Sequence, residues 1–163
     1  MRIFAQCHAP VERGTRRSLA QLARAAVAEA LRQGGALGRT ETGVLFTDDS
    51  EMRALNRDFR NSDRPTDVLA FAMRETAKGD RPVGEQPTDE LLGDIVVSLD
   101  TARRQAAARG HSLRREVAVL LIHGTLHLIG YDHPSGPGGR NTARTMRAAE
   151  RACLAALEDA LIL

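Results

Sequence analysis

Three histidines between His123 and His133 are the residues whose type and spacing best suit chemistry. His123 and His127 are four residues apart, so their imidazoles project from one face of a helix. Gly130 then lets the backbone leave the helix with a positive φ, so that His133 can turn back toward the same point. Three neutral imidazoles that converge in this way form an open zinc-type site, with a fourth position free for water.

The alternative for a single histidine on an apolar helix is a hydrogen-bonded core residue. Three uncompensated imidazoles in so apolar a stretch would each carry a desolvation penalty, which a shared cation removes. The triplet therefore predicts one Zn²⁺ per chain, although three imidazoles also accept nickel, copper or iron. Asp132, beside the third histidine, has two interpretations that stay open. It orients an imidazole or moves a proton, or it caps the turn at Gly130.

The spacing of the three histidines is also that of the metzincin proteases, with one chemical difference. Those enzymes carry a general-base glutamate directly after the first histidine, whereas this chain has Gly124. Glycine can neither take a proton from water nor return one to a leaving amine, so peptide hydrolysis lacks its acid–base residue. A metal can still lower the pKa of water and polarise a phosphoryl oxygen, which leaves phosphodiester hydrolysis open.

The elements that must position these residues predict one α+β domain over residues 1–163, with a single mixed sheet of about four strands packed with about five helices. Apolar, β-branched segments predict strands at residues 2–6, 43–47, 67–73 and 91–99. Helical periodicity and caps predict helices at residues 15–33, 48–59, 100–110, 112–129 and 141–163. Asp48 with Glu51 forms a capping box, and Asp100 and Ser112 are expected to begin the next two helices. Residues 74–89 and 134–139, rich in glycine and proline, are predicted loops.

Composition excludes several classes of protein. The chain has 163 residues, 42% hydrophobic and 27% charged, as in globular domains and unlike disordered chains. The aromatic fraction of 3% argues against a base-stacking platform. Cys7 and Cys153 are too few for a disulfide-stapled scaffold or an all-thiolate zinc site. No export signal is visible, and the aliphatic run 117–122 is too short for a membrane span, so we expect a cytoplasmic protein.

Arginine supplies nearly all of the positive charge, since Lys78 is the single lysine among 23 basic residues. Five arginines bracket one predicted turn, and they could contact an RNA backbone. A solvated helix face is the favoured interpretation for Arg103, Arg104, Arg109, Arg114 and Arg115.

His8 with Cys7 is a weak rival pair of metal ligands. Asp67 is expected to fix the entry to a strand, and His111 is expected to support the junction between two helices.

Three blocks of sequence extend these inferences: LNRDFRNSDRPTDVLAF (55–71), LLGDIVVSLDTARRQA (91–106) and GHSLRREVAVLLIHGTLHLIGYDH (110–133). Together they resemble the YbeY family of bacterial ribosomal-RNA maturation factors, described as metal-dependent endoribonucleases. The resemblance implies zinc held by His123, His127 and His133, and a role in small-subunit ribosomal RNA processing and ribosome quality control. It implies ribosomal RNA and the ribosome or ribosomal proteins as partners, with neither DNA nor a membrane. By the same match, Arg60 is the arginine that the family uses in its RNA-binding and catalytic cleft.

Two departures from the family pattern are visible. Ala70-Phe71-Ala72 stands where the family commonly has S-F-P, and the segment after the third histidine is basic where the family is usually acidic. That segment carries Arg140, Arg144, Arg147 and Arg151, with only Glu150 opposing, which predicts a more basic rim to the cleft.

The leading hypothesis is a zinc-dependent, single-strand-specific endoribonuclease in which the metal activates water and Arg60 positions the phosphate. The alternatives are a non-catalytic, zinc-stabilised ribosome assembly factor and, disfavoured by Gly124, a divergent metallopeptidase.

Overall fold

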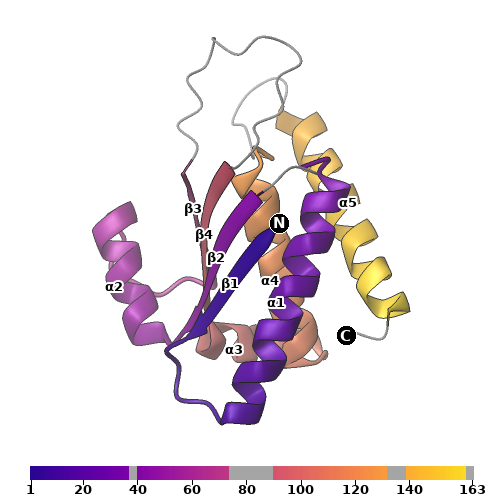
Figure 1. Ribbon diagram of the computed structural model, residues 1–163. Coiled ribbons are helices and arrows are strands. Elements are labelled where there is room, and N and C mark those ends of the chain that lie inside the picture. Colours follow the sequence, from indigo (N-terminus) through magenta and orange to yellow (C-terminus); the bar gives the residue numbers. More distant parts are fainter. Residues whose placement is uncertain (37–39, 74–89, 132–138, 161–163) are drawn as a thin grey trace.

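A computed structural model describes residues 1–36, 40–73, 90–131 and 139–160 (Figure 1). Over these residues the chain forms one mixed sheet with helices on both faces, which confirms the predicted α+β class. The strands are β1 (Arg2–Cys7), β2 (Thr40–Thr47), β3 (Val68–Ala72) and β4 (Glu90–Ser98). The helices are α1 (Arg13–Gln33), α2 (Asp49–Arg60), α3 (Leu99–Arg109), α4 (Leu113–Leu128) and α5 (Gly139–Asp159).

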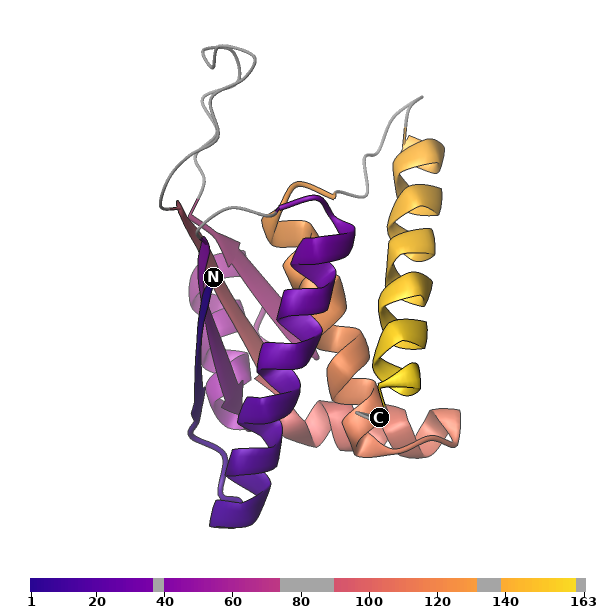
Figure 2. The same ribbon diagram turned by 45° about the vertical axis from the view of Figure 1, so that its right-hand side comes forward.

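The sheet has the strand order β1-β2-β4-β3, with β1, β2 and β4 parallel and the edge strand β3 antiparallel to β4. Helix α2 packs on one face, while α1 and α4 cover the other (Figure 1). Helix α5 lies outside α1 and α4 as a further layer (Figure 2). The register of β2 with β4 shifts at Glu41/Thr42, opposite Gly93. Gly93 has φ 129°, and a Cβ there would overlap the carbonyl oxygen of Phe71, so only glycine fits.

Alternation along β4 divides the core between the two faces. Ile95 and Val97 belong to the large cluster formed with α1, α4 and α5, whereas Val96 joins Met52 and Leu69 in a smaller cluster under α2. This period of two is the expected consequence of the pleat. The large cluster anchors α4, whose residues from Val117 onward are mostly buried, as predicted from their apolarity.

The caps match the sequence with one exception. Ser112 accepts a hydrogen bond from the Arg115 amide (3.1 Å), as predicted, and Asp48 accepts one from the Glu51 amide (2.9 Å). This second bond is one half of the predicted capping box, since the Glu51 carboxylate bonds Thr47 and His8. The prediction that Asp100 caps α3 is wrong. The N-cap is Ser98, whose hydroxyl accepts from the Thr101 amide at 3.2 Å.

Asp100 serves another helix, because its carboxylate accepts a hydrogen bond from the Asp49 amide (3.2 Å) at the start of α2. Other element ends differ from the prediction by a few residues, with β2 beginning at Thr40 and α5 at Gly139. The predicted loop 74–89, and residues 134–138 of the other, lie outside the described residues. Within the described parts of the chain, the search for a helix that is long and apolar enough to cross a membrane finds none.

Candidate functional site

The two histidines of α4 face each other across the distance that a shared ligand would need. Nε2 of His123 lies 3.1 Å from Nε2 of His127, and the ring centroids are 4.6 Å apart. Two imidazoles bound tetrahedrally to one zinc, with Zn–N bonds of 2.0–2.1 Å, would bring their nitrogens to about 3.3 Å. The separation of the two nitrogens is therefore close to that of two ligands on one zinc.

The burial pattern of α4 explains why these imidazoles are accessible. Most of the helix circumference is buried, and Val119, His123 and His127 form the less buried stripe at i, i+4 spacing. The His123 side chain is 31% exposed. The core thus holds the helix rigidly while the histidine stripe stays open to a solute.

Glu150 of α5 contacts the imidazole of His123 on the ring nitrogen that faces away from His127. Its Oε1 lies 2.8 Å from Nδ1 of His123, and the side chain is only 23% exposed. A carboxylate accepts hydrogen bonds, so Nδ1 of His123 is the donor to Glu150, and Nε2 of the same ring is the atom that faces His127. This carboxylate–histidine arrangement is typical of zinc sites, where the outer carboxylate fixes the tautomer and raises the basicity of the ligand.

Sequence reasoning missed this role of Glu150, although a signal was present. Glu150 follows the buried Met146 by four residues and precedes the buried Cys153 by three, so it lies on the apolar stripe of an amphipathic helix. A carboxylate on such a stripe needs a partner.

Gly124 lies on the side of α4 that packs against the sheet. A Cβ at Gly124 would lie 3.0 Å from Cγ2 of Ile95 and 3.4 Å from Cγ2 of Val68, both in the sheet. The position therefore serves the close approach of α4 to the sheet. A glutamate placed there would meet packed strands, which agrees with the absence of the protease general base.

The third predicted ligand, His133, and its neighbour Asp132 lie outside the described residues. The chain approaches them as predicted, since Gly130 has φ 94° just after α4 ends. Within the described residues there is no group of three or more His, Cys, Asp or Glu side chains that could hold a metal ion. A complete site thus requires a further ligand, and His133 stays a prediction.

Arg60 is the last residue of α2, with an exposed side chain, and is followed by Asn61 in the left-handed region (φ 55°). Edge strand β3 lies between this helix and α4. Phe71 of β3 stacks edge-on against Phe59 (centroids 5.0 Å apart) on the α2 side, and Val68 lies beside Gly124 on the α4 side. Arg60 and the histidines are therefore carried on opposite faces of one edge strand.

Contacts within the protein engage all five arginines around the α3–α4 turn. Ion pairs join Arg103 to Asp100, Arg104 to Asp49, Arg109 to Glu116 and Arg115 to Glu158, and Arg114 donates to the Ser18 hydroxyl. These contacts support the structural interpretation over an RNA contact.

The fully buried Glu116 also lies 3.0 Å from Nε2 of His111, which places His111 at the helix junction as predicted. His8 faces Glu51, with Nδ1 3.0 Å from Oε1, and the Cys7 thiol donates to the Ala9 carbonyl. These contacts account for both members of the rival ligand pair.

Asp67 fixes the entry to β3 as predicted. Its Oδ1 accepts from the Val68 amide (2.8 Å) and its Oδ2 from Nε2 of Gln105 (3.0 Å). Burial alone would raise the pKa of Asp67, but the hydrogen bonds from Gln105, Val68 and Thr66 outweigh burial and hold that pKa below its usual value.

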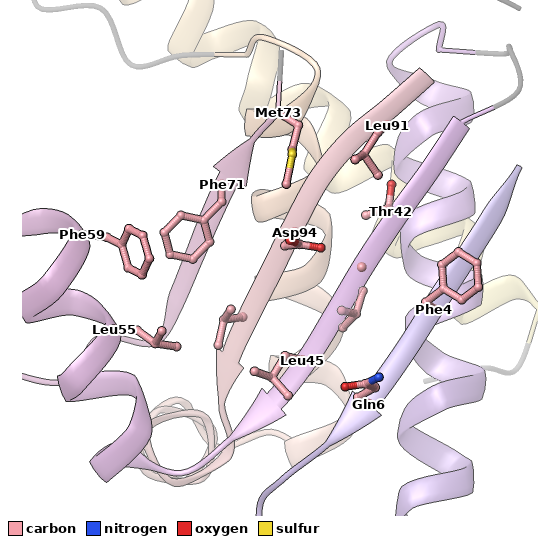
Figure 3. A pocket seen from close by; sticks show the side chains of 13 residues that line it. Phe4, Gln6, Thr42, Leu45, Leu55, Phe59, Phe71, Met73, Leu91 and Asp94 are labelled. Atoms are coloured by element: carbon pink, nitrogen blue, oxygen red, sulfur yellow. The ribbon is translucent and has the colours of Figure 1, made fainter. Parts of the chain in front are cut away.

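A depression lies on the face of the sheet opposite α4, beside α2 (Figure 3). It has a volume of about 600 Å³ and exposes Phe4, Phe59, Met73 and Leu91. Among the described residues that line it, Asp94, which projects from β4, is the single charged one. This groove is apolar, and the imidazoles of α4 take no part in its lining.

Comparison with known proteins agrees with this fold and site. The family model described as Endoribonuclease YbeY matches residues 7–158. The chain belongs to this family. A YbeY relative from Desulforamulus reducens is 47% identical over 71% of this chain and 74% of its own length. One from Roseiflexus castenholzii is 44% identical over 85% of this chain and 83% of its own length.

A YbeY relative from Halalkalibacterium halodurans is 50% identical over 60% of this chain, and this alignment spans 62% of that protein. The solution structure of TM1509 from Thermotoga maritima shares the fold, with a TM-score of 0.57 and 22% identity over 99% of this chain and 95% of that one. The family resemblance seen in the sequence is thus confirmed. The predicted enzyme class, a hydrolytic nuclease, is the class that the family name denotes.

Proposed function

We propose that this protein is a zinc-dependent endoribonuclease that cleaves single-stranded RNA during maturation of the small-subunit ribosomal RNA and in ribosome quality control. The observation that carries the proposal is the accessible pair His123 and His127, with Nε2 atoms 3.1 Å apart and Glu150 behind the first imidazole. Membership of the Endoribonuclease YbeY family supports RNA as the substrate. The ribosome or its proteins would be the partners, and the cytoplasm the location.

His123, His127 and His133 would hold one Zn²⁺ per chain, or another divalent transition metal with similar preference for imidazole. When bound, the metal lowers the pKa of water and polarises a phosphoryl oxygen. The residues of the chain prepare this site. Glu150 accepts a hydrogen bond from Nδ1 of His123 and so orients this imidazole, while the packing of Gly124 on the sheet fixes the helix.

Arg60 would position the phosphate. A guanidinium can donate two parallel hydrogen bonds to a phosphate and offset charge that develops on its oxygens. Because Arg60 and the histidines flank β3 on its two faces, an RNA strand that crosses this edge would meet both. Asp132, next to the third histidine, would orient an imidazole or move a proton.

The test is cleavage of ribosomal RNA together with metal analysis, using two variants. His127→Ala is expected to lose cleavage and zinc together, whereas Arg60→Glu is expected to lose cleavage and keep its zinc. Cleavage by a rigorously metal-free preparation would refute the mechanism. If zinc restores the melting curve of the metal-free protein while no RNA is cut under any condition, the assembly-factor alternative replaces the enzyme.

A further inference from the structure

Helix α5 carries a stripe of exposed arginines. Arg144, Arg147 and Arg151 follow one another at i, i+3 and i+7, so they share one face of the helix. All three are exposed, and they span about 10 Å along the helix axis. A stripe of this length can contact more than one phosphate of an extended strand.

These three arginines differ from most others in the described parts of the chain. Eight arginines on other elements are paired with carboxylates: Arg2, Arg32, Arg53, Arg57, Arg103, Arg104, Arg109 and Arg115. Among the described residues, Arg144, Arg147 and Arg151 have no carboxylate partner. The nearest acid along the helix, Glu150, is bound to His123, and Glu158 is bound to Arg115. The positive charge of the three arginines is therefore available to an external anion.

The stripe lies beside the part of α4 that leads to the histidines. Arg147 and Arg151 line a groove of about 220 Å³ between α4 and α5, together with Val119, Ile122, Glu150 and Leu154. Glu150 in this groove is the residue that bonds His123, and Val119 lies one turn before His123 on the same stripe of α4. Figure 2 shows α5 running alongside α4. The groove thus lies next to the residue that contacts His123, one turn of α4 before that histidine.

We propose that Arg144, Arg147 and Arg151 bind backbone phosphates of single-stranded RNA on one side of the cleaved bond and hold the strand along α5. The inference rests on the proposed function, which supplies RNA as the substrate. Phosphates favour this assignment over an acidic peptide because guanidinium groups bind them bidentately and the repeat of the stripe matches a regularly charged backbone. Sequence preference is not expected, since backbone contacts read no bases.

The experiment measures binding of a short single-stranded RNA with 2′-O-methyl riboses by fluorescence anisotropy over a range of salt concentrations. The double variant Arg147→Gln/Arg151→Gln is compared with the wild type. Each lost phosphate contact lowers the magnitude of the log K against log salt slope by about 0.7, so the double variant should lose about 1.4. If the plots of log K against log salt for the wild type and the double variant meet near 1 M salt, the Kd of the double variant at 0.1 M is about 25-fold higher than that of the wild type.

The matched control is Arg17→Gln/Arg24→Gln, which removes the same charge from two exposed arginines of α1, seven residues apart. Its slope should equal that of the wild type. An unchanged slope for the α5 variant, or an equal loss in the control, would overturn the inference. The inference would also be overturned if polyglutamate bound to these arginines more tightly than RNA does.

A separate cleavage assay on unmodified ribosomal RNA keeps the two proposals apart. If the wild type cleaves RNA while the α5 variant has the same salt slope as the wild type, only the proposal that α5 binds phosphates is contradicted. A wild type that cuts no RNA while the slope falls as expected contradicts the nuclease proposal and supports the stripe.

Discussion

Replacing Glu150 by glutamine tests the link between α5 and the histidine pair. The carboxylate lies 2.8 Å from Nδ1 of His123 and is 23% exposed, so the hydrogen bond is charge-assisted and partly shielded from water. Loss of such an outer partner typically costs 10- to 100-fold in metal affinity. Glutamine keeps an acceptor oxygen and loses only the charge, so we expect about a tenfold loss, or about 1.4 kcal/mol. Glu150→Ala also removes the acceptor, so its loss should approach 100-fold.

The assay is competition for zinc between the metal-free protein and a chromophoric chelator of known affinity. Glu158→Gln is the matched control, because it removes the same charge from the same helix where Glu158 pairs with Arg115. Its zinc affinity should stay within about twofold of the wild type. The reasoning fails if Glu150→Gln binds zinc as tightly as the wild type, or if Glu158→Gln weakens binding as much.

Two further predictions concern stability. Gly124→Glu should lower the free energy of unfolding by at least about 3 kcal/mol in urea titrations, because its carboxylate would be buried against Ile95 and Val68; a loss below 1 kcal/mol would contradict the close packing of α4. Asp67 has a lowered pKa, so its stabilisation is present above the unfolded pKa of about 3.9 and is lost as pH falls through the lower folded value. Asp67→Asn should therefore destabilise the protein at pH 7 and much less at pH 2, and an equal loss at both pH values would show that ionisation is irrelevant.

Local features of the sequence were sufficient for the fold class and for the histidine pair. Hydrophobic periodicity located all nine described elements, and the i, i+4 spacing of His123 and His127 placed both imidazoles on one helix face. The turn at Gly130 followed from the conformational freedom of glycine, and its φ of 94° agrees.

Features that depend on distant parts of the chain could not be predicted in this way. Glu150 meets His123 only because α5 packs as an outer layer over α4, 27 residues later in the sequence. The insertion of β4 between β2 and β3 makes β3 an edge strand, and the packing of α2 and α4 on the two faces of the sheet places Arg60 and the histidines on either side of it. Ser98 and Asp100 are both good capping residues, and the position of the Asp49 amide directs Asp100 to another helix.

The most direct test of the account is a titration of metal-free protein with Zn²⁺ while RNA cleavage and bound metal are measured on the same samples. We predict no cleavage without metal, a rise in proportion to bound zinc, and saturation at one zinc per chain. His127→Ala should neither bind this zinc nor gain activity. Full cleavage before any zinc is added, or activity that does not follow the zinc bound to His123 and His127, would contradict the account.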